Sequence, residues 1–426
     1  MEPSQGRCSR AYGSGVISID FGFTSSAAAV TIPTEGDSNA TEFSIIEKFA
    51  TKLLVKDPEE PNFSFIVPGT DNNTVGRKLC YFKALLMDSF REQPGDTEVM
   101  EACIASAQGL DLPEDPNVVS IFLKGLWGEA RNLLGSFLAG SHSGRDGLPH
   151  VVVTYPGIWN ESELRRLKLA VRNAGIEKEC CQGCGVRYCT EQAAAVHAVL
   201  FDYPEQLEPQ HENGESMIVA DCGGLTLDAA TYEFCSPSVP RSSESLGEIV
   251  DAKSSFTGGL SLNIAFDNMI SDNLKRVSQR SDDQLLTSSL RRRAEAGKWF
   301  EHNIKPKFGD LRRNPYDDVW RFSNVAGCEV VIDRANMVRT FDPIIETIVA
   351  HIVELYARAK ARGKQPKVVF LTGGVSQSPR IQNWVRKKLK KVDIDLQLII
   401  STLYESVGVV GRVFYLKLDY RTSKFG

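Results

Sequence analysis

The sequence of 426 residues predicts a mixed α/β protein with two similar halves. A strand that ends in aspartate, a tight glycine turn and a return strand follow one another near residue 20 and again near residue 221. In addition, an apolar strand leads through a turn into a helix at 150–175 and again at 367–389. Units of this kind build sheets that are covered by helices. We therefore expect two lobes, at residues 15–205 and 206–415.

The first lobe is expected to begin with a strand at Val16–Asp20, a turn at Gly22 and a return strand at 26–32. The residues before it, 1–14, are polar and rich in glycine and serine, so we expect a disordered N-terminus.

An inserted subdomain is expected at about 34–148. Short apolar runs between Pro, Asp, Asn and Gly clusters at 34–76 predict small strands and loops. Apolar residues then recur at helical spacing at 75–90 and at 117–138. The glycine-containing loop at 139–149 closes this subdomain.

The apolar run His150–Tyr155 predicts a buried strand, which Pro156 ends. Either Asn160 or Ser162 can cap the following helix, and Gly175 can end it in the left-handed conformation. This is a strand-turn-helix unit of an α/β sheet.

The second lobe repeats these patterns. A helix at 192–201 and an acidic loop at 202–216 lead into it. Its expected elements are strands at 217–221 and 223–234, a largely helical insertion at about 260–340, a helix at 342–360, a strand at 367–372, a helix at 379–389 and a C-terminal tail at 416–426.

The composition is that of a soluble globular protein, with 42% hydrophobic and 24% charged residues. A formal net charge of −5 argues against binding to nucleic acid or to a membrane surface. The run Arg291–Arg293 is read as a solvated helix face. No apolar stretch reaches the roughly 20 residues that a spanning helix needs, and residues 1–15 lack the apolar segment of a secretory signal. We therefore expect a cytoplasmic protein, or one that enters the nucleus by passive routes.

Four of the ten cysteines lie close together: Cys180, Cys181, Cys184 and Cys189. The pair Cys181 and Cys184 has the spacing of half a zinc site, but the usual second pair is missing. We favour a cysteine-rich connecting loop and keep a metal or redox site as the alternative.

The two glycine turns suit phosphate binding. Glycine lets backbone N–H groups converge on phosphate oxygens without a Cβ in the way. Thr24, Ser25 and Thr226 can add hydroxyl donors to the turns. Asp20 and Asp221, each at a strand end, can hold hydrated Mg²⁺ beside the phosphates. Two such turns predict a clamp for one metal–nucleotide.

A third glycine pair, Gly373-Gly374, follows an apolar strand and precedes a helix. Backbone can approach a ring or a ribose closely at such a pair, and the helix N-terminus favours anionic groups. With the two turns, this pair predicts an adenosine site.

The order of these motifs resembles the actin-like ATPase superfamily, and within it the nucleotide-binding domain of heat-shock protein 70 chaperones and their divergent relatives. The likeness covers roughly residues 15–415. It is carried by Tyr155–Ser162 (YPGIWNES), Phe256–Leu260 (FTGGL), Leu371–Ile381 (LTGGVSQSPRI) and the segment from Asp221 to Asp228. The resemblance implies a two-lobed, ribonuclease H-like fold with a nucleotide cleft between the lobes, and ATP or ADP with Mg²⁺ as ligands.

The resemblance also implies roles for individual residues. Asp20 and Asp221 would hold Mg²⁺ through water and, with Glu191 and Lys83, would form the catalytic set. The nucleotide-binding set would be Gly22, Phe23, Thr24, Ser25, Gly223, Gly224, Leu225, Thr226, Asp228, Gly258, Gly259, Lys305, Gly373, Gly374, Val375 and Gln377.

Four of these positions depart from the family's pattern or have a second interpretation. Phe23 stands where the family has a hydroxyl residue. Leu225 replaces a third glycine, at a cost if that backbone needs a positive φ, and it intrudes where a phosphate approaches. Either Glu191 serves after a one-residue deletion, or the family's glutamate role is vacant. Lys83 is the expected catalytic lysine or, alternatively, a surface lysine on an amphipathic helix.

Three functions fit these patterns. The first is a slow Mg²⁺-dependent ATPase whose lobes close with nucleotide state, with Glu191 or Asp228 orienting the attacking water. The second is a non-catalytic nucleotide sensor or scaffold, which Phe23, Leu225 and the shifted Glu191 favour. The third is a small-molecule kinase of the same superfamily. The nucleotide is the one partner that the sequence predicts, and we expect no substrate-binding domain, because nothing after residue 415 resembles the chaperones' linker.

Overall fold

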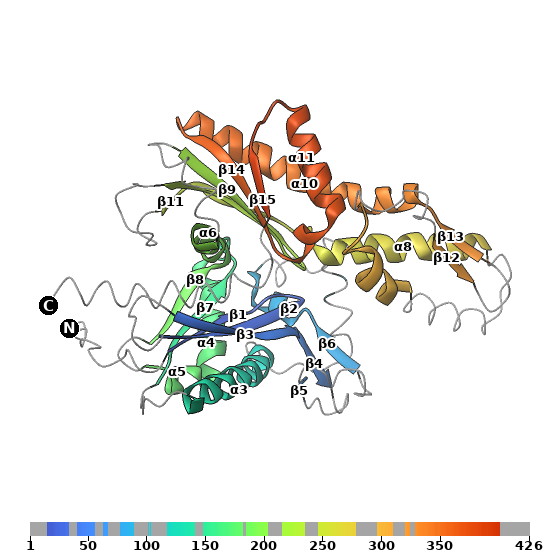
Figure 1. Ribbon diagram of the computed structural model, residues 1–426. Coiled ribbons are helices and arrows are strands. Elements are labelled where there is room, and N and C mark those ends of the chain that lie inside the picture. Colours follow the sequence, from blue (N-terminus) through green and yellow to red (C-terminus); the bar gives the residue numbers. More distant parts are fainter. Residues whose placement is uncertain are drawn as a thin grey trace. The chain divides into compact units, whose positions relative to one another are not determined.

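A computed structural model describes residues 15–33, 41–55, 63–66, 77–88, 101, 103, 117–140, 148–181, 185–202, 215–234, 246–277, 296–309, 320–323 and 329–400. The chain divides into two compact units. Unit 1 comprises Met1–Asn213, Phe234–Gly247 and Leu403–Gly426, and unit 2 comprises Gly214–Glu233 and Glu248–Thr402. The described residues form a mixed α/β protein with several sheets and helices (Figure 1).

Unit 1 is built on a five-stranded sheet in the order β3-β2-β1-β7-β8. These strands are β1 Val16–Asp20, β2 Ser25–Pro33, β3 Thr41–Ala50, β7 His150–Tyr155 and β8 Val186–Thr190. β1 pairs antiparallel with β2 and parallel with β7, and β7 pairs parallel with β8. The predicted first hairpin is therefore present, with its turn between Asp20 and Ser25.

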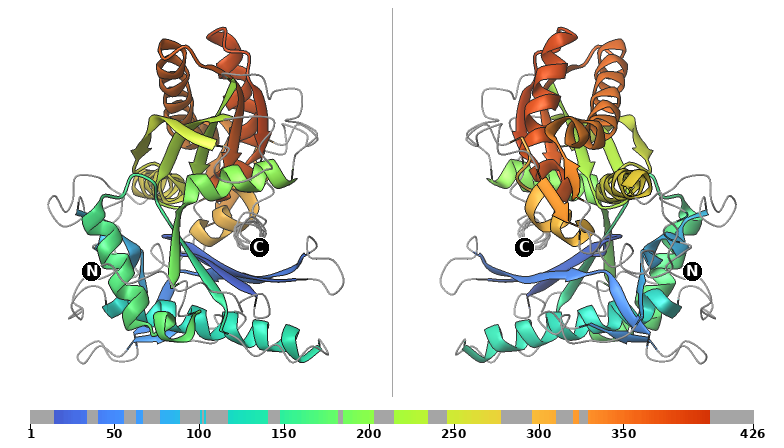
Figure 2. Two further views of the ribbon diagram at one scale, coloured as in Figure 1. Left: turned by 90° about the vertical axis from the view of Figure 1, so that its left-hand side faces the viewer. Right: turned by 90° about the vertical axis from the view of Figure 1, so that its right-hand side faces the viewer.

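Four described helices belong to unit 1: α3 Asn117–Gly140, α4 Glu161–Asn173, α5 Ile176–Glu179 and α6 Glu191–Asp202. α3 packs against β2 and against α4 (Figure 2). α4 begins as its sequence predicts, because the Asn160 side chain accepts from the N–H of Glu163 while the Glu163 carboxylate accepts from the N–H of Asn160. Gly175 follows the helix with φ 85°, as expected of a helix-ending glycine.

The helix predicted at 75–90 is wrong. Arg77–Cys80 is instead a strand, β6, which pairs with β4 (Lys52–Val55) in a small sheet that also contains β5 (Phe63–Phe65). Tyr81 has φ 61°, which no α-helix allows, and the 3₁₀ helix η2 follows at Phe82–Leu86. Pairing with a strand distant in sequence therefore overrides the helical spacing of the apolar residues.

Unit 2 is built on a second five-stranded sheet, in the order β11-β10-β9-β14-β15. These strands are β9 Glu215–Cys222, β10 Leu227–Phe234, β11 Leu246–Ser255, β14 Gln365–Thr372 and β15 Gln397–Ile400. β9 pairs antiparallel with β10 and parallel with β14, and β14 pairs parallel with β15. The two sheets thus repeat one order: a hairpin partner beside a first strand, then two parallel strands.

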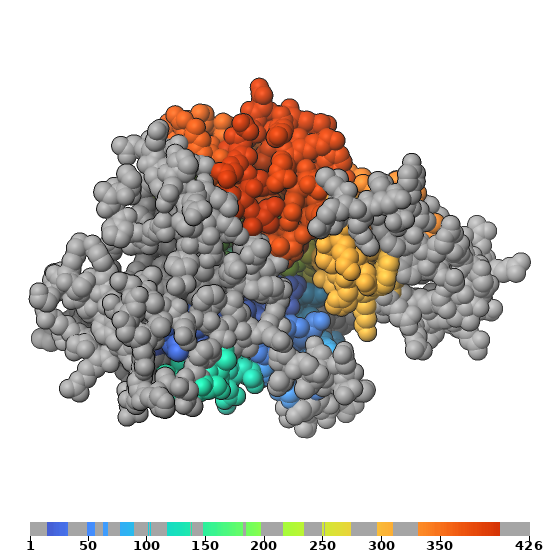
Figure 3. Space-filling view, in the orientation of Figure 1, coloured from blue at the N-terminus to red at the C-terminus, as the bar shows by residue number. Residues whose placement is uncertain are grey.

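The helical elements of unit 2 are α8 Gly259–Val277, η5 Phe300–Ile304 (a π-helix), α10 Arg334–Ala361, η7 Gly374–Gln377 (a 3₁₀ helix) and α11 Pro379–Lys391. The predicted helical insertion at 260–340 contains in addition a two-stranded sheet of β12 Trp320–Ser323 and β13 Glu329–Ile332. α10 packs against β9, β14 and α11 (Figures 1 and 2). On the face seen in Figure 3, the chain from α10 to β15 forms one continuous surface.

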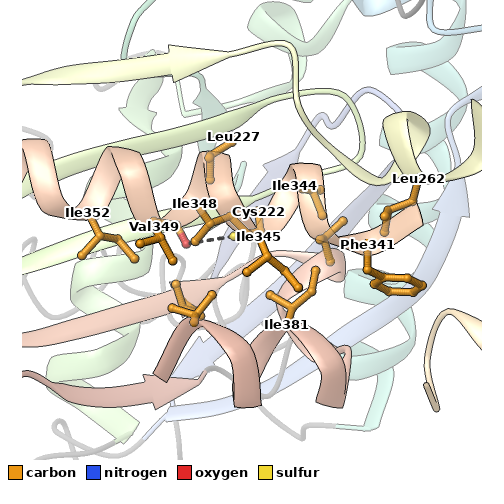
Figure 4. Packing of buried hydrophobic residues seen from close by; sticks show 14 of the residues in the cluster. Cys222, Leu227, Leu262, Phe341, Ile344, Ile345, Ile348, Val349, Ile352 and Ile381 are labelled. Atoms are coloured by element: carbon orange, nitrogen blue, oxygen red, sulfur yellow. Dashed lines mark hydrogen bonds between the residues drawn. The ribbon is translucent and has the colours of Figure 1, made fainter. Parts of the chain in front are cut away.

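The core of unit 2 lies between the sheet and α10. Ile345, Ile348 and Ile352 of α10 are fully buried and meet Cys222 and Leu227 of the hairpin strands (Figure 4). Burying side chains of this size stabilises a fold by about 1.5–3 kcal/mol each. This core therefore holds the turn between β9 and β10 on a rigid base.

Among the helices in the described part of the chain, none combines the length and the apolar character needed to cross a membrane.

Candidate functional site

The turn that joins β1 to β2 in unit 1 is tightly constrained. A Cβ on Gly22 would come within 2.2 Å of the Ser25 carbonyl oxygen, so that only glycine fits there. The Thr51 hydroxyl donates to the carbonyl oxygen of Gly22 at 2.9 Å, and the N–H of Thr51 donates to the carbonyl oxygen of Thr24 at 3.0 Å. At the end of β1, the Thr154 hydroxyl donates to Oδ1 of Asp20 at 3.0 Å.

The turn that joins β9 to β10 in unit 2 repeats this geometry. A Cβ on Gly223 would lie 3.1 Å from the carbonyl oxygen of Thr226. In both turns the nearest atom thus belongs to the residue three positions after the glycine. The N–H of Gly223 donates to that oxygen at 3.0 Å. Asp221 pairs with Asp228 across the hairpin, just as Asp20 pairs with Ala27.

Several amides of both turns are available to a ligand. Within the described residues, the N–H groups of Phe23 and Thr24 in the first turn meet no backbone acceptor. The same holds for Gly224, Leu225 and Thr226 in the second turn. Successive N–H groups of this kind form an anion-binding concavity.

The acidic residue inside the second hairpin is held in place. Asp228 is 1% exposed, and its Oδ2 accepts a hydrogen bond of 2.7 Å from the Thr226 hydroxyl. Cys222 follows Asp221 and is fully buried; burial, together with the carboxylates of Asp221 and Asp228, raises the pKa of its thiol. Cys222 is therefore an unreactive core residue.

The backbone cost predicted for Leu225 is absent, which corrects the sequence interpretation. Leu225 is not among the residues with positive φ, and its side chain is 1% exposed. Because the φ of Leu225 itself is not positive, the turn accepts a side chain at this position without backbone strain. Leu225 is a buried apolar side chain of the turn.

The glycine pair Gly258-Gly259 packs directly on the second turn. The N–H of Gly259 donates to the carbonyl oxygen of Gly223 at 3.0 Å, and the N–H of Leu260 donates to that of Gly224 at 2.7 Å. A Cβ on Gly258 would lie 2.8 Å from the carbonyl oxygen of Gly223. The pair stands at the start of α8, so that the positive end of this helix dipole lies at the turn.

Gly373 closes the second turn from the side of β14. It has φ 83°, and a Cβ there would lie 2.5 Å from Oδ1 of Asp221 and 2.4 Å from the carbonyl oxygen of Cys222. The backbone therefore approaches the Asp221 carboxylate closely, which only glycine permits. Gly374 and Gln377 lie in η7, which follows Gly373. Val375, in the same 3₁₀ helix, packs near Gly259, because a Cβ placed on Gly259 would lie 3.3 Å from Cγ2 of Val375.

Lys305 lies just after η5 and is engaged by its own chain. Its ammonium donates to the carbonyl oxygen of Gly259 at 3.0 Å, to Oδ1 of Asn263 at 3.1 Å and to Oε2 of Glu301 at 2.9 Å. Burial raises the pKa of Glu301, but the charge and hydrogen bond of Lys305 outweigh it, and the pKa lies below its usual value. These three acceptors account for the three N–H groups of the ammonium.

Lys83 and Glu191, which lie 108 residues apart in the sequence, form an ion pair in unit 1. Lys83 Nζ lies 2.8 Å from Oε1 of Glu191, and the lysine side chain is 1% exposed. Lys83 is thus a buried residue of η2 and not a surface lysine. Glu191 is the first residue of α6 and supplies the carboxylate of this ion pair.

Three aromatic rings surround the same ammonium. Lys83 Nζ lies 4.8 Å from the ring centroid of Phe23, 5.3 Å from that of Trp159 and 5.6 Å from that of Phe21. All three are within the range of cation–π attraction. Sequence reasoning gave Trp159 no role, although it lies in the segment that resembles the chaperones; only the fold brings it to Lys83.

Two further buried groups near this pair lack a hydrogen-bond partner among the described residues, namely Nε1 of Trp159 and Nε2 of Gln192. Gln192 is fixed by its other amide atom, because its Oε1 accepts from the N–H of Gly157 at 3.0 Å. Both groups were missed by sequence reasoning, since nothing in the sequence indicates which donors lack acceptors.

The structure brings the predicted residues together in two separate sets. In unit 1, the β1–β2 turn, Lys83 and Glu191 are joined through the ring of Phe23. In unit 2, Asp221, the β9–β10 turn, Gly258-Gly259, Lys305 and Gly373 are in contact. Of the alternative metal site, Cys184 lies outside the described residues, and the residues described contain no group of three or more His, Cys, Asp or Glu side chains placed to hold a metal ion.

One family model matches part of the chain. It is described as a domain of unknown function (DUF8340) and covers residues 210–318, which include β9, β10 and Lys305. No curated protein matches the chain.

Proposed function

We propose that this chain binds ATP or ADP with Mg²⁺ on an actin-like ATPase fold related to the nucleotide-binding domain of heat-shock protein 70 chaperones. The observation that carries the proposal is the packing in unit 2 of Gly258-Gly259 on the β9–β10 turn and of Gly373 on Asp221. Glycine is required at Gly258 and Gly373 by contacts of 2.4–2.8 Å that a Cβ would make. Beside these glycines, the N–H groups of Gly224, Leu225 and Thr226 in the β9–β10 turn meet no backbone acceptor among the described residues.

The chemistry of these groups fits a metal-bound polyphosphate. The turn amides would donate to phosphate oxygens, and the N-terminus of α8 adds a favourable dipole. Asp221 would hold the Mg²⁺ through water, and the metal would neutralise phosphate charge. The nucleoside would bind beside Gly373 and Gly374, which lie next to this carboxylate. The repeated strand order and the repeated turn in the two units support a fold of two similar lobes.

Hydrolysis, in this proposal, is slow. Phosphoryl transfer depends on positioning and on charge at the developing transition state. Lys83 is paired with Glu191 and Lys305 with Glu301, so each cation is already bonded within the chain. A non-catalytic nucleotide sensor is the second candidate, and the enclosed Lys83 is the observation that favours it.

The proposal predicts that ATP with Mg²⁺ stabilises the folded chain. A ligand at 100 times its dissociation constant stabilises the native state by about 2.7 kcal/mol, which raises the melting temperature by a few degrees. Asp221→Asn should reduce this shift, because the amide cannot replace the carboxylate as a partner for hydrated Mg²⁺.

The matched control is Asp395→Asn, at an exposed carboxylate after α11. It should leave the shift unchanged. An absent shift at millimolar ATP and Mg²⁺ in the parent chain would refute the proposal. Phosphate release measured on the same samples then separates the slow ATPase from the sensor.

A further inference from the structure

Two segments of unit 2 that carry residues of the proposed nucleotide site are in contact with each other. Lys305 opens the turn at 305–309, and the pair Gly373-Gly374 leads into η7 and α11. The segments meet at Gly259, where a Cβ would lie 3.1 Å from Lys305 Nζ and 3.3 Å from Cγ2 of Val375. Both segments belong to one compact unit, so the contact is internal to it.

Arg380 joins the same two segments a second time. It is the second residue of α11, and its N–H donates to the carbonyl oxygen of Phe308 at 2.9 Å. Gly309 follows with φ 84°, and a Cβ there would lie 2.6 Å from Cα of Arg380. Nδ2 of Asn383, one turn further along α11, donates to the carbonyl oxygen of Gly309 at 3.1 Å. The turn at 305–309 therefore rests directly on the start of α11.

The side chain of Arg380 is engaged within the protein. Its guanidinium carbon lies 4.4 Å from the ring centroid of Trp384 and 5.9 Å from that of Phe308, both within the range of cation–π attraction. Its Nη2 donates to Oδ1 of Asp342 in α10 at 2.8 Å. Only 7% of the side chain is exposed. Arg380 therefore acts on its neighbours and does not extend into solvent to bind a ligand.

We propose that Arg380 is a positioning residue for the nucleoside side of the proposed nucleotide site. It fixes the turn at 305–309, and with it Lys305, in place beside Gly373-Gly374. This inference rests on the proposed function. Binding groups are effective when the residues that support them hold them within about 0.5 Å of the productive geometry. Loss of the Arg380 side chain therefore weakens the binding of the nucleoside.

The phosphate side of the site has separate supports. The β9–β10 turn is held by its own two strands and by the N–H groups of Gly259 and Leu260, which donate to the carbonyl oxygens of Gly223 and Gly224. None of these bonds involves Arg380. The binding of phosphate alone is therefore expected to be the same with and without the Arg380 side chain.

The test compares Arg380→Leu with Arg380→Lys in the full chain. Calorimetry with Mg²⁺ measures the dissociation constants of ADP and of pyrophosphate, which carries two linked phosphates without a nucleoside. Arg380→Leu should raise the dissociation constant of ADP about tenfold, which corresponds to about 1.4 kcal/mol, and leave that of pyrophosphate unchanged. Arg380→Lys keeps a cation beside Asp342 and the rings, so it should restore part of the ADP affinity.

Lys387→Leu is the matched control. Lys387 Nζ lies 4.1 Å from the same Trp384 ring, but its side chain is exposed on α11. The substitution removes a cation from the ring and leaves the bonds of Arg380 and Asn383 to the turn in place. The ADP affinity should equal that of the parent. An equal loss of ADP affinity in Lys387→Leu would show that loosening of α11 is responsible, and would overturn the proposal.

Hydrogen exchange followed by mass spectrometry examines the turn without any nucleotide. The N–H groups of Lys307 and Phe308 donate to the carbonyl oxygen of Ile304 at 2.9 Å and 2.7 Å. They should exchange faster in Arg380→Leu than in Lys387→Leu, because the turn has lost its support. Equal exchange in the two variants would overturn the proposal.

The two ligands distinguish failure of this inference from failure of the proposed function. If ADP and pyrophosphate lose affinity equally in Arg380→Leu, Arg380 does not serve the nucleoside side, and the inference is wrong. If the parent chain binds neither ligand, the proposed function fails and the inference fails with it. Should Arg380→Leu not fold, Asp342→Asn removes the carboxylate partner of the guanidinium, and an unchanged ADP constant in that variant overturns the inference.

Discussion

Gly373 shows how strongly a single residue can be constrained beside the candidate site. Its φ of 83° and the 2.5 Å that would separate a Cβ from Oδ1 of Asp221 are two independent barriers to any side chain. Gly363 has a similar φ of 74°, but no atom lies within 4 Å of its Cβ position. The two glycines therefore differ in crowding, and Gly373 also combines its positive φ with a ψ of 163°, a region that essentially only glycine adopts.

We predict that Gly373→Ala destabilises the fold by more than Gly363→Ala. A positive φ costs alanine about 1–2 kcal/mol even in the left-handed helical region. At Gly373 the ψ of 163° and the overlap with Asp221 and Cys222 both add to this cost. Urea unfolding of both variants measures the difference. Equal losses of stability would show that the backbone around Asp221 can retreat from a methyl group.

Leu225 gives a second prediction at this scale. Because its backbone is not left-handed and its side chain is 1% exposed, Leu225→Gly relieves no strain and removes core contacts. We expect a loss of at least about 2–5 kcal/mol, the range for Leu→Ala in protein cores. Denaturant unfolding checks it. A variant as stable as the parent would mean that Leu225 does not contribute to the core.

Some individual residues of the candidate site could be predicted from the sequence, and others could not. Gly22, Gly223 and Gly373 follow from a local pattern, a strand end that turns tightly, which the chain carries in adjacent residues. The family resemblance placed Lys83 and Glu191 in one catalytic set, but neither their ion pair nor its aromatic cover was expected. Contacts between distant segments depend on the whole fold, so a local pattern does not reveal them.

At the scale of elements, α3 contains a glycine where packing leaves no space for a side chain and another where nothing is near. A Cβ on Gly125 would come within 2.2 Å of Cγ in the ring of Phe65, whereas Gly128, one turn further along the same helix, has nothing within 4 Å. The close approach of α3 to β5 thus depends on one missing side chain.

We predict opposite effects for the same substitution at these two glycines. Gly128→Ala should stabilise the chain by up to about 1 kcal/mol, because alanine favours the helix. Gly125→Ala should destabilise it by about 1–3 kcal/mol, since the Phe65 ring must move. Melting temperatures of both variants test this. Stabilisation by Gly125→Ala would contradict the tight packing of α3 on β5.

The elements that the sequence predicted well are those whose ends carry local signals. α4 has its capping box and its terminal glycine, and β7 is bounded by proline. By contrast, α10 begins at Arg334, eight residues before the predicted start at Asp342. Asp333 and Asn336 form a capping box upstream of the predicted start, and the helix continues through Pro343.

At the scale of the molecule, the repeated sheet order is the feature that the sequence indicated and the structure describes in both units. Two hairpins with the same Asp-to-Gly spacing lie on sheets of the same order, each followed by two parallel strands. A repeat of this kind is detectable because the turn, the strand end and the register are all local. The buried ionisable groups, however, emerge only in the folded chain.

His351 of α10 is one such group, and it makes stability depend on pH. Its side chain is 4% exposed, and its Nδ1 has no partner among the described residues. Burial first, and then the charge of Lys253, lower its pKa to about 4, although Glu354 acts in the opposite direction. The unfolded chain therefore binds a proton at His351 between about pH 6.5 and 4 that the folded chain does not.

The free energy of unfolding must consequently fall as the pH decreases through this window. The contribution of neutral His351 is fully present above the unfolded pKa of about 6.5. We predict that the parent chain loses about 1–3 kcal/mol more than His351→Gln between pH 7 and pH 4.5, because glutamine cannot take up the proton. Carboxylates with lowered pKa, such as Glu301, titrate in both proteins and cancel in the comparison. Urea unfolding at both pH values measures the two losses. Equal losses in parent and variant would show that His351 is protonated in the folded chain as readily as in the unfolded one.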